Sequence, residues 1–279
     1  MIRRVLSVLV LVLLPAAASA RGGYWVPTPA DTFQWDLEQP VHTDVPATMY
    51  DIDMFDNPAS VVAKLHALGR HVICYIDVGS WERYRPDAKK YPRRILGEHY
   101  PGYPDERFVD IRALDVLGPI LAARFDLCKA KGFDAVEPDN IDTYQADTGF
   151  TLTGNDELRF IAWLIMQAHQ RGLSIGQKND PAQTPQVEKS FDWALLEECF
   201  YYRFCQRFRS YVADGKAVFD TEYKSDTSLP VFLHRDCPSD VKFGYFLIYK
   251  HLNLDAYRVT CSGSAEGPYR FLVLPRVIH

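Results

Sequence analysis

Apolar runs of strand length recur along the chain and alternate with segments whose apolar positions follow a helical period. Several of these runs are almost continuously apolar, as is typical of parallel strands that are covered on both faces. The pattern predicts eight strands, at residues 33–37, 47–53, 71–77, 133–139, 173–179, 192–197, 217–223 and 244–249. Between them it predicts helices that include residues 58–68, 114–131 and 156–171.

The same kind of junction joins each of these three helices to the strand that follows it. Gly69, Gly132 and Gly172 stand directly after the helices. Glycine readily adopts the left-handed conformation that ends a helix. Eight strands in this βαβ rhythm favour a closed barrel over an open sheet. We therefore expect a single α/β domain, a (β/α)8 TIM barrel, with residues 33–250 as its core.

Residues 80–112 break this rhythm. They follow the third predicted strand and are rich in proline and aromatic residues, including Trp81 and Tyr84. Long ordered loops of this kind often form walls or lids of functional sites. We expect a long loop that borders the site. The last apolar run, at residues 271–277, is expected to pack outside the barrel.

The first twenty residues have the organisation of a secretory signal peptide. Two arginines precede an apolar run at residues 5–14, and Ala18-Ser19-Ala20 supplies the small residues of a cleavage site. We expect cleavage after Ala20, which leaves residues 21–279 as the barrel domain; the alternative is an uncleaved anchor helix. No later run is long and apolar enough to cross a membrane. The predicted location is secreted or periplasmic, without membrane contact after cleavage.

The charge of the chain bears on its partners. The formal net charge is −5, and it becomes −7 without Arg3 and Arg4. The absence of a basic block makes nucleic acid a poor candidate partner. A mildly acidic protein suits a neutral or cationic substrate better than an anionic one. We expect a monomer without a nucleic-acid partner.

Six cysteines follow the predicted cleavage point, and export would permit disulfides. We favour the pairs Cys199–Cys205 and Cys237–Cys261 because each pair is close in sequence or flanks the last strand. Cys74 lies inside an apolar strand, so we expect a buried thiol there. The chain has no CxxC pair and no HExxH motif, and we expect neither a catalytic metal nor a cofactor.

Acidic residues gather at the carboxyl ends of the predicted strands, the ends that face the active site of a barrel. These residues are Asp51, Asp53, Asp77, Glu137, Asp139, Asp142, Asp180, Glu197, Glu198 and Glu222. Each one alone could be an ordinary polar strand end or a helix cap. Together they indicate a site, because bringing several acids close together is costly without a purpose.

A pair of carboxylates facing each other across a barrel is the machinery of glycoside hydrolysis. Aromatic side chains near the rim would stack on sugar rings, although core packing is the commoner role for any one of them; they are Trp35, Tyr50, Trp81, Tyr84, Tyr144 and Tyr201. The chain has no glycine-rich phosphate loop and no GxSxG elbow. The residues therefore favour sugar chemistry over phosphate chemistry or a serine nucleophile.

Ordered motifs between about Trp35 and Tyr223 resemble glycoside hydrolase family 114, the endo-α-1,4-polygalactosaminidase-type barrels. They include Trp35-Asp36-Leu37, Val72-Ile73-Cys74-Tyr75, Glu137-Pro138-Asp139-Asn140, Gly176-Gln177-Lys178-Asn179-Asp180 and Leu196-Glu197-Glu198-Cys199. The resemblance implies a (β/α)8 fold and cleavage of α-1,4-linked galactosamine polymers. It also implies that Asp139 and Glu197 are the catalytic pair, which we interpret as nucleophile and general acid/base. We expect the substrate-binding residues to be Asp53, Asp77, Trp81, Glu82, Asn140, Asp142, Tyr144, Lys178, Asn179, Glu198, Glu222 and Tyr249.

Three positions depart from the family pattern. Asp77 adds an acid after the third strand, Asp36 replaces a glutamine, and Glu198 replaces a glutamine beside Glu197. Glu198 leaves open which glutamate is catalytic, although neighbours in a strand point to opposite sides. Two alternatives to the polygalactosaminidase hypothesis stay open: a non-catalytic glycan-binding barrel, and a hydrolase of a different α-linked glycan.

Overall fold

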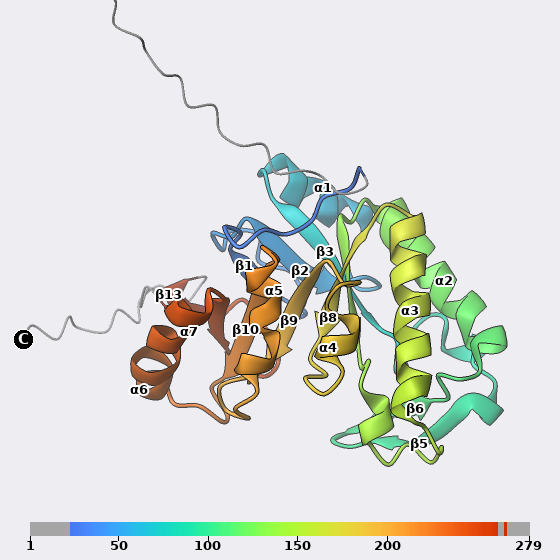
Figure 1. The fold of residues 1–279 in the computed structure, drawn as a ribbon. Coiled ribbons are helices and arrows are strands. Elements are labelled where there is room, and N and C mark those ends of the chain that lie inside the picture. The colour runs from blue at the N-terminus through green and yellow to red at the C-terminus, as the bar shows by residue number, and fades with distance from the viewer. Residues whose placement is uncertain (1–22, 262–264, 267–279) are drawn as a thin grey trace, which may run out of the picture.

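The computed structural model describes residues 23–261 and 265–266 and shows a barrel of parallel strands (Figure 1). Eight parallel strands follow one another as hydrogen-bonded neighbours in the order β1-β2-β3-β7-β8-β9-β10-β11. They are β1 (Phe33–Trp35), β2 (Met49–Asp53), β3 (His71–Asp77), β7 (Ala135–Asp139), β8 (Ser174–Lys178), β9 (Trp193–Glu197), β10 (Val218–Tyr223) and β11 (Phe246–Lys250). All eight predicted strands are confirmed, and the (β/α)8 prediction is confirmed with them.

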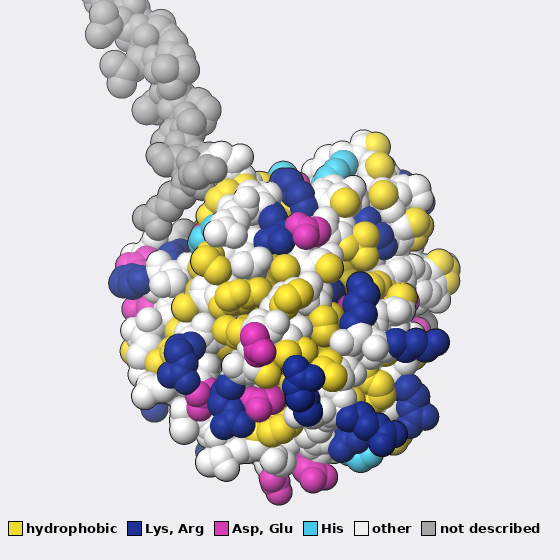
Figure 2. Space-filling view, turned by 90° about the vertical axis from the view of Figure 1, so that its right-hand side faces the viewer, with side chains coloured by type: hydrophobic (Ala, Val, Ile, Leu, Met, Phe, Trp, Pro, Cys, Tyr) yellow, Lys and Arg dark blue, Asp and Glu magenta, His cyan; other side chains and the backbone are white. Residues whose placement is uncertain are grey.

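Helices pack against the outside of these strands, and the long α2 and α3 lie along one flank (Figure 1). Their bounds are α1 (Ala59–Ala67), α2 (Leu114–Lys131), α3 (Gly154–Gln170), α4 (Thr184–Val187), α5 (Arg209–Ala213), α6 (Leu229–Val231), the π-helical turn Phe232–Asp236 and α7 (Cys237–Phe243). Short 3-10 turns occur at Ala88–Lys90, Arg93–Ile95, Thr143–Gln145 and Cys205–Phe208. Figure 2 shows the flank of α2 and α3, where basic side chains are spaced among apolar and acidic ones.

The first and the last parallel strands meet through the segment that follows β11. The backbone N–H of Leu37 donates to the carbonyl of Leu254 at 2.9 Å, and the Gln34 amide donates to the carbonyl of Ala256 at 3.4 Å. Arg258 adds a hydrogen bond to the carbonyl of Phe33. The sheet then continues antiparallel through β12 (Arg258–Thr260) and β13 (Ala265–Glu266). The barrel is therefore nearly closed, with this segment bridging its seam.

The aromatic segment after β3 was expected to be a loop, and the structure corrects this expectation. It contains a three-stranded antiparallel sheet of β4 (Ser80–Glu82), β5 (Leu96–Tyr100) and β6 (Tyr103–Val109), in the order β4-β6-β5. A tight turn at Pro101-Gly102 joins β5 to β6, and Gly102 supplies the positive φ of 84°. The short strands and prolines masked the two-residue alternation that predicts a hairpin.

Two of the expected disulfides, Cys199–Cys205 and Cys237–Cys261, are confirmed. The expectation that Cys74 is a free thiol is wrong, because Cys74 is bonded to Cys128 with a Cα–Cα distance of 6.0 Å. Cys74 belongs to the core between the strands and the helices, where α2 brings Cys128 to it. The strand pattern predicted the burial of Cys74 but not the helix that covers it.

Two expectations concern residues outside the described part of the chain. They are the signal peptide with its cleavage after Ala20, and the packing of the run at residues 271–277. Among the residues that the structure describes, none of the helices combines the length and the hydrophobicity needed to cross a bilayer.

Strand alternation sorts side chains between two cores. One apolar cluster fills the barrel, with Trp193 and Leu195 of β9 among its members. Ala194 and Leu196 belong instead to the larger cluster between strands and helices. Because side chains alternate along a strand, Glu197 at the end of β9 continues the inward row. The same rule places Asp139 of β7 and Lys178 of β8 inside the barrel mouth.

Candidate active site

A cavity of about 530 Å³ opens at the carboxyl ends of the parallel strands. Its acidic lining residues are Glu38, Asp53, Asp56, Asp77, Glu82, Glu106, Asp139, Asp142 and Glu197. The lining contains nine acids but only two lysine or arginine residues, Arg85 and Lys178. The cavity is therefore strongly anionic, and it lies where barrels of this fold carry their active sites.

Lys178 joins the acids at the floor of the cavity. Its ammonium lies 3.1 Å from Asp139 Oδ1, 3.0 Å from Glu197 Oε2 and 2.7 Å from Glu137 Oε1. It also lies 4.4 Å from the centre of the Trp35 ring. Burial alone would lower the pKa of Lys178, but the three carboxylates outweigh burial and raise the pKa well above its usual range. The lysine is a fixed cation.

These two ion pairs limit the separation of Asp139 and Glu197. Asp139 Oδ1 and Glu197 Oε2 cannot lie farther apart than the sum of their distances to the shared ammonium, about 6.1 Å. The two side chains come from β7 and β9, on either side of β8. They are 20% and 28% exposed, whereas Lys178 is 3% exposed. The acids are thus open to a substrate, and the lysine is shielded from it.

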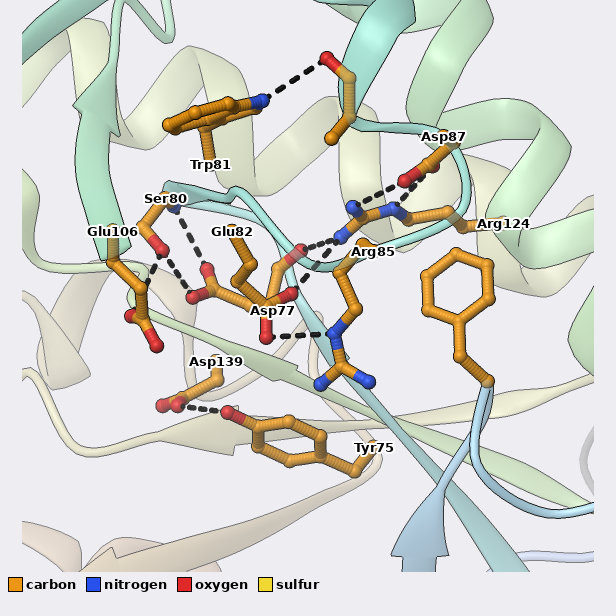
Figure 3. Close-up of polar contacts among 12 residues, drawn as sticks. Tyr75, Asp77, Ser80, Trp81, Glu82, Arg85, Asp87, Glu106, Arg124 and Asp139 are labelled. Atoms are coloured by element: carbon orange, nitrogen blue, oxygen red, sulfur yellow. Dashed lines mark hydrogen bonds and ion pairs between the residues drawn. The ribbon is translucent and has the colours of Figure 1, made fainter. Parts of the chain in front are cut away.

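Each of the two acids accepts a hydrogen bond from a tyrosine hydroxyl. Tyr75 donates to Asp139 Oδ2 at 2.8 Å (Figure 3), and Tyr223 donates to Glu197 Oε1. The backbone N–H of Asn140 donates to Asp139 Oδ1 at 3.0 Å. These bonds fix the orientation of both carboxylates before any substrate enters.

The chain turns sharply where these strands end. Asn140, Asn179 and Glu198 have φ values of 63°, 45° and 55°. Asparagine tolerates this left-handed region, whereas for glutamate it is unusual. The turn at Asn179 brings its side-chain oxygen within 2.8 Å of the backbone N–H of Glu197. Strand ends that carry site residues are therefore held in strained but hydrogen-bonded turns.

Asp77 is fully engaged with its neighbours. Its Oδ1 accepts the backbone N–H groups of Gly79 and Ser80, at 3.0 and 2.8 Å. Its Oδ2 accepts the Ser80 hydroxyl (Figure 3) and, at 3.0 Å, the Asn140 amide. The Asn140 amide oxygen in turn accepts the hydroxyl of Tyr100 at 2.7 Å. Asp77, the acid that departs from the family pattern, therefore positions Asn140 beside Asp139.

Arg85 neutralises one side of the cavity. Its guanidinium lies 2.6 Å from Asp53, 2.7 Å from Glu82 and 3.4 Å from Asp56. Burial and the charge of Asp77 raise the pKa of Glu82 to about 7, despite the arginine. Arg85 is thus shared among three acids and has little charge left for a further partner.

The structure brings together nine of the predicted site residues and separates the other five from the cavity. Those that line it are Asp53, Asp77, Glu82, Asp139, Asn140, Asp142, Lys178, Asn179 and Glu197. The residues outside the lining are Trp81, Tyr144, Glu198, Glu222 and Tyr249.

The strands and the turn after β9 account for three of these five placements. Glu222 and Tyr249 alternate with the inward Tyr223 and Ile248 on β10 and β11, whereas Glu198 follows the end of β9 in a left-handed turn. Local contacts explain the other two: the Trp81 indole donates to the carbonyl of Ala88, and Tyr144 donates to Asp180.

Several lining residues escaped the sequence analysis. Tyr75 and Tyr223 lie on the inward faces of β3 and β10, and alternation from Asp77 would have identified Tyr75. Tyr100, Tyr103 and Glu106 come from β5 and β6, whose register no motif indicated. For residues 80–112, the aromatic and proline content predicted only that the segment borders the site.

Comparison with known proteins identifies the family. The family model of glycoside-hydrolase family GH114 matches residues 14–266. The chain belongs to this family. The resemblance inferred from its motifs is confirmed, and the chain is a glycoside hydrolase. A comparison with curated proteins gave no match.

Solved structures agree with this assignment. Ega3 from Aspergillus fumigatus, solved in complex with galactosamine, is 32% identical, with a TM-score of 0.75 over 86% of this chain and 100% of its own. The glycoside hydrolase domain of PelA from Pseudomonas aeruginosa is 12% identical, with a TM-score of 0.62 over 82% of this chain and 97% of its own. An α-galactosidase from Thermus thermophilus is 10% identical, with a TM-score of 0.52 over 80% of this chain and 58% of its own. The last two show the fold alone.

Proposed function

We propose that this GH114 barrel cleaves α-1,4-linked galactosamine polysaccharide internally, with Asp139 and Glu197 as its catalytic pair. The observation that carries the proposal is the placement of both carboxylates on one buried ammonium, that of Lys178, at the floor of an anionic cavity. Two acids within reach of one glycosidic bond are what hydrolysis of that bond requires.

The distance between the acids bears on the stereochemical course, whereas the division of roles between them is taken from the family resemblance. Inverting enzymes separate their two carboxyl groups by about 6.5–9.5 Å, to leave room for a water molecule, and retaining enzymes by about 5–5.5 Å. The upper bound of about 6.1 Å on the nearest Asp139 and Glu197 oxygens favours the retaining arrangement. Asp139 would attack the anomeric carbon while Glu197 protonates the leaving oxygen. Glu197 would then take a proton from the water that hydrolyses the glycosyl-enzyme bond.

Glu197 rather than Glu198 fills the acid/base role in this proposal. Glu197 lines the cavity and contacts Lys178, whereas Glu198 lies outside the lining. Burial and the charge of Asp226 raise the pKa of Glu198 to about 7. That pKa would suit a general acid, but a group must first reach the leaving oxygen. Geometry therefore takes precedence over pKa in this choice.

The substrate class rests on the relative and on the charge of the cavity. Ega3, at 32% identity, was solved with galactosamine bound. A sugar that carries an ammonium group would be attracted into a cavity where nine acids face two lysine or arginine charges. A neutral hexose would gain nothing from this excess, so the charge favours an amino sugar over another α-linked glycan.

The location follows from the disulfides as well as from the N-terminal pattern. Three disulfides join residues within the described part of the chain. Such bonds persist in oxidising compartments. They support the proposal that residues 1–20 direct export and that the enzyme acts in the periplasm or outside the cell.

Release of reducing ends from de-N-acetylated galactosamine polymer tests the proposal. Asp139→Asn and Glu197→Gln should each abolish measurable release, while Glu198→Gln, a matched change one residue away, should retain most of it. NMR of the first products should show the α-anomer. Unchanged activity in both catalytic variants would reject the assignment, and a β-anomeric first product would reject the retaining mechanism.

A further inference from the structure

Glu106 lies in the cavity without a cationic partner. It belongs to β6, which runs antiparallel to β4, and its carboxylate lies beside Ser80 (Figure 3). The Ser80 hydroxyl lies 3.4 Å from Glu106 Oε2 and the Tyr84 hydroxyl lies 3.3 Å from Oε1, but the single proton of each hydroxyl is shared with a nearer carboxylate, that of Asp77 or Glu82. Both contacts are long for hydrogen bonds between oxygen atoms. The carboxylate is therefore only weakly held by the protein.

The two basic side chains that line the cavity, Arg85 and Lys178, already form ion pairs with other acids. Arg85 pairs with Asp53, Asp56 and Glu82, and Lys178 pairs with three acids deeper in the barrel. Among the described residues, no basic side chain forms an ion pair with Glu106. Its electrostatic neighbours are the acids Asp77 and Asp139. The surroundings of Glu106 thus have an excess of negative charge that the protein itself leaves uncompensated.

Asp77 cannot take this role, because both of its oxygens already accept hydrogen bonds from the protein. Asp142 also lines the cavity, but Lys178 is among its close electrostatic neighbours and stabilises its charge. Glu106 is accordingly the acid near Asp139 that lacks both a cation and strong hydrogen bonds.

Exposed aromatic rings lie on the same wall. Tyr84 is 61% exposed and Tyr103 is 52% exposed, and both line the cavity. Large exposed rings suit the apolar face of a sugar. The Tyr84 hydroxyl lies 2.8 Å from Glu82 and 3.3 Å from Glu106, so this ring and the Glu106 carboxylate face one space.

We infer that Glu106 binds the ammonium group of a galactosamine unit next to the cleaved bond, and so makes the enzyme selective for a de-N-acetylated unit there. This inference rests on the proposed function. An ammonium group supplies the missing cation and three hydrogen-bond donors, whereas an acetamido group has no charge and a single N–H. An N-acetylated unit would cover the Glu106 carboxylate without compensating its charge.

The test compares Glu106→Gln with Glu98→Gln, a change of an exposed glutamate on the neighbouring β5. Substrates are fully de-N-acetylated and partly N-acetylated galactosamine oligomers, with products sequenced by mass spectrometry. For the de-N-acetylated oligomer, Glu106→Gln should lower kcat/KM by about 10- to 100-fold, mainly through KM, because one charged hydrogen bond is lost. The same variant should accept an N-acetylated unit at that position, which wild type and Glu98→Gln reject.

The pH dependence provides a second readout. Burial and the charge of Asp77 raise the pKa of free Glu106 to about 7. The wild-type KM for the de-N-acetylated oligomer should therefore rise as the pH falls below about 7, since the carboxylate is lost. Glu106→Gln should flatten this dependence, and Glu106→Asp should restore part of it.

Folding and binding are measured separately from turnover. Circular dichroism checks each variant, and calorimetric titration with the oligomer in the Asp139→Asn background reports binding without cleavage. Wild-type affinity and acetylation pattern in Glu106→Gln would overturn this inference and leave the proposed function intact. If the wild-type enzyme fails to cleave the galactosamine oligomers, both the proposed function and this inference fall.

Discussion

The ammonium of Lys178 lies 2.7 Å from a carboxylate oxygen of Glu137, which is itself fully buried within the barrel. Asp51 lies near Glu137, and both oxygens of Asp51 lack a donor. Burial and the charge of Glu137 raise the pKa of Asp51 well above its usual range. Lys178 contacts three acids, Glu137, Asp139 and Glu197, and its single positive charge offsets the repulsion between Asp139 and Glu197.

Lys178→Met should leave these acids without their shared cation. We expect kcat to fall by at least about 100-fold, because like charges at this separation cannot both stay ionised and the carboxylates would move apart. Initial rates against pH measure the effect, and the acidic limb of the profile should move to higher pH. Lys129→Met, at an exposed lysine on α2, is the matched control. Near-normal turnover in Lys178→Met would contradict the role given to this cation.

The two tyrosine hydroxyls make it possible to assign the two acids. Tyr75→Phe removes a donor from Asp139, and Tyr223→Phe removes a donor from Glu197. Loss of a hydrogen bond to a carboxylate raises its pKa and costs about 10- to 100-fold in kcat. If Asp139 is the nucleophile, Tyr75→Phe should move the acidic limb of kcat/KM upward. If Glu197 is the general acid, Tyr223→Phe should move the basic limb upward.

A profile in which both variants move the same limb would refute this division of roles. Tyr144→Phe serves as the control, since Tyr144 lies outside the cavity and donates to Asp180.

At Gly79, the turn that follows β3 packs closely against the backbone of Asn140, in the turn that follows β7. A Cβ atom at Gly79 would lie 1.9 Å from the carbonyl oxygen of Asn140, which is backbone and cannot rotate away. We expect Gly79→Ala to destabilise the protein by about 1–3 kcal/mol or more and to displace Asp139, so activity falls as well. Chemical denaturation and kcat measure the two effects.

Gly215→Ala provides the comparison for that variant. A Cβ atom at Gly215 would meet no atom within 4 Å, although its φ of 73° is strained for alanine. It should cost about 1 kcal/mol and leave kcat unchanged. Equal losses of activity in the two variants would show that the contact with Asn140 is unimportant.

Because of Asp240 in α7, the free energy of unfolding should fall as the pH rises. Burial raises the pKa of Asp240 to about 7 in the folded state, against 3.8 for an unburied aspartate. Its stabilising contribution is therefore full below about pH 4 and is lost as pH rises through 7. Asp240→Asn should match wild type near pH 4 and exceed it by about 1–3 kcal/mol at pH 8.

Urea denaturation across pH 4–8 measures this difference, and the exposed Asp105→Asn should show no such trend. A constant difference between Asp240→Asn and wild type at all pH values would disprove the buried-acid explanation.

Much of the fold could be predicted because it repeats a local pattern. The helix–glycine–strand junction at Gly132 and Gly172 is visible in sequence, and both glycines have the positive φ that ends a helix. The inward position of Glu197 follows from alternation with Trp193 and Leu195. Such features depend on neighbours along the chain, which is why the eight strands and the acidic rim were predictable, whereas the choice of Asp139 and Glu197 among these acids came from the family resemblance.

Features that depend on distant segments were not predictable. Lys178 pairs with acids from two neighbouring strands, and no spacing in the chain encodes these distances. Cys74 pairs with Cys128 across 54 residues because α2 covers β3. Glu106 enters the cavity because of the hairpin register between β5 and β6. In each case tertiary packing, rather than local propensity, decides the contact.

The small antiparallel sheet of β4, β5 and β6 stands apart from the strands that carry Asp139 and Glu197. Under the proposed roles, bond cleavage and choice of sugar are encoded in separate stretches of the chain. Mutations within residues 80–109 can explore new polymers while the hydrolytic apparatus is preserved. Laboratory evolution confined to this insertion is thus a direct route to enzymes of the same barrel with altered polysaccharide preference.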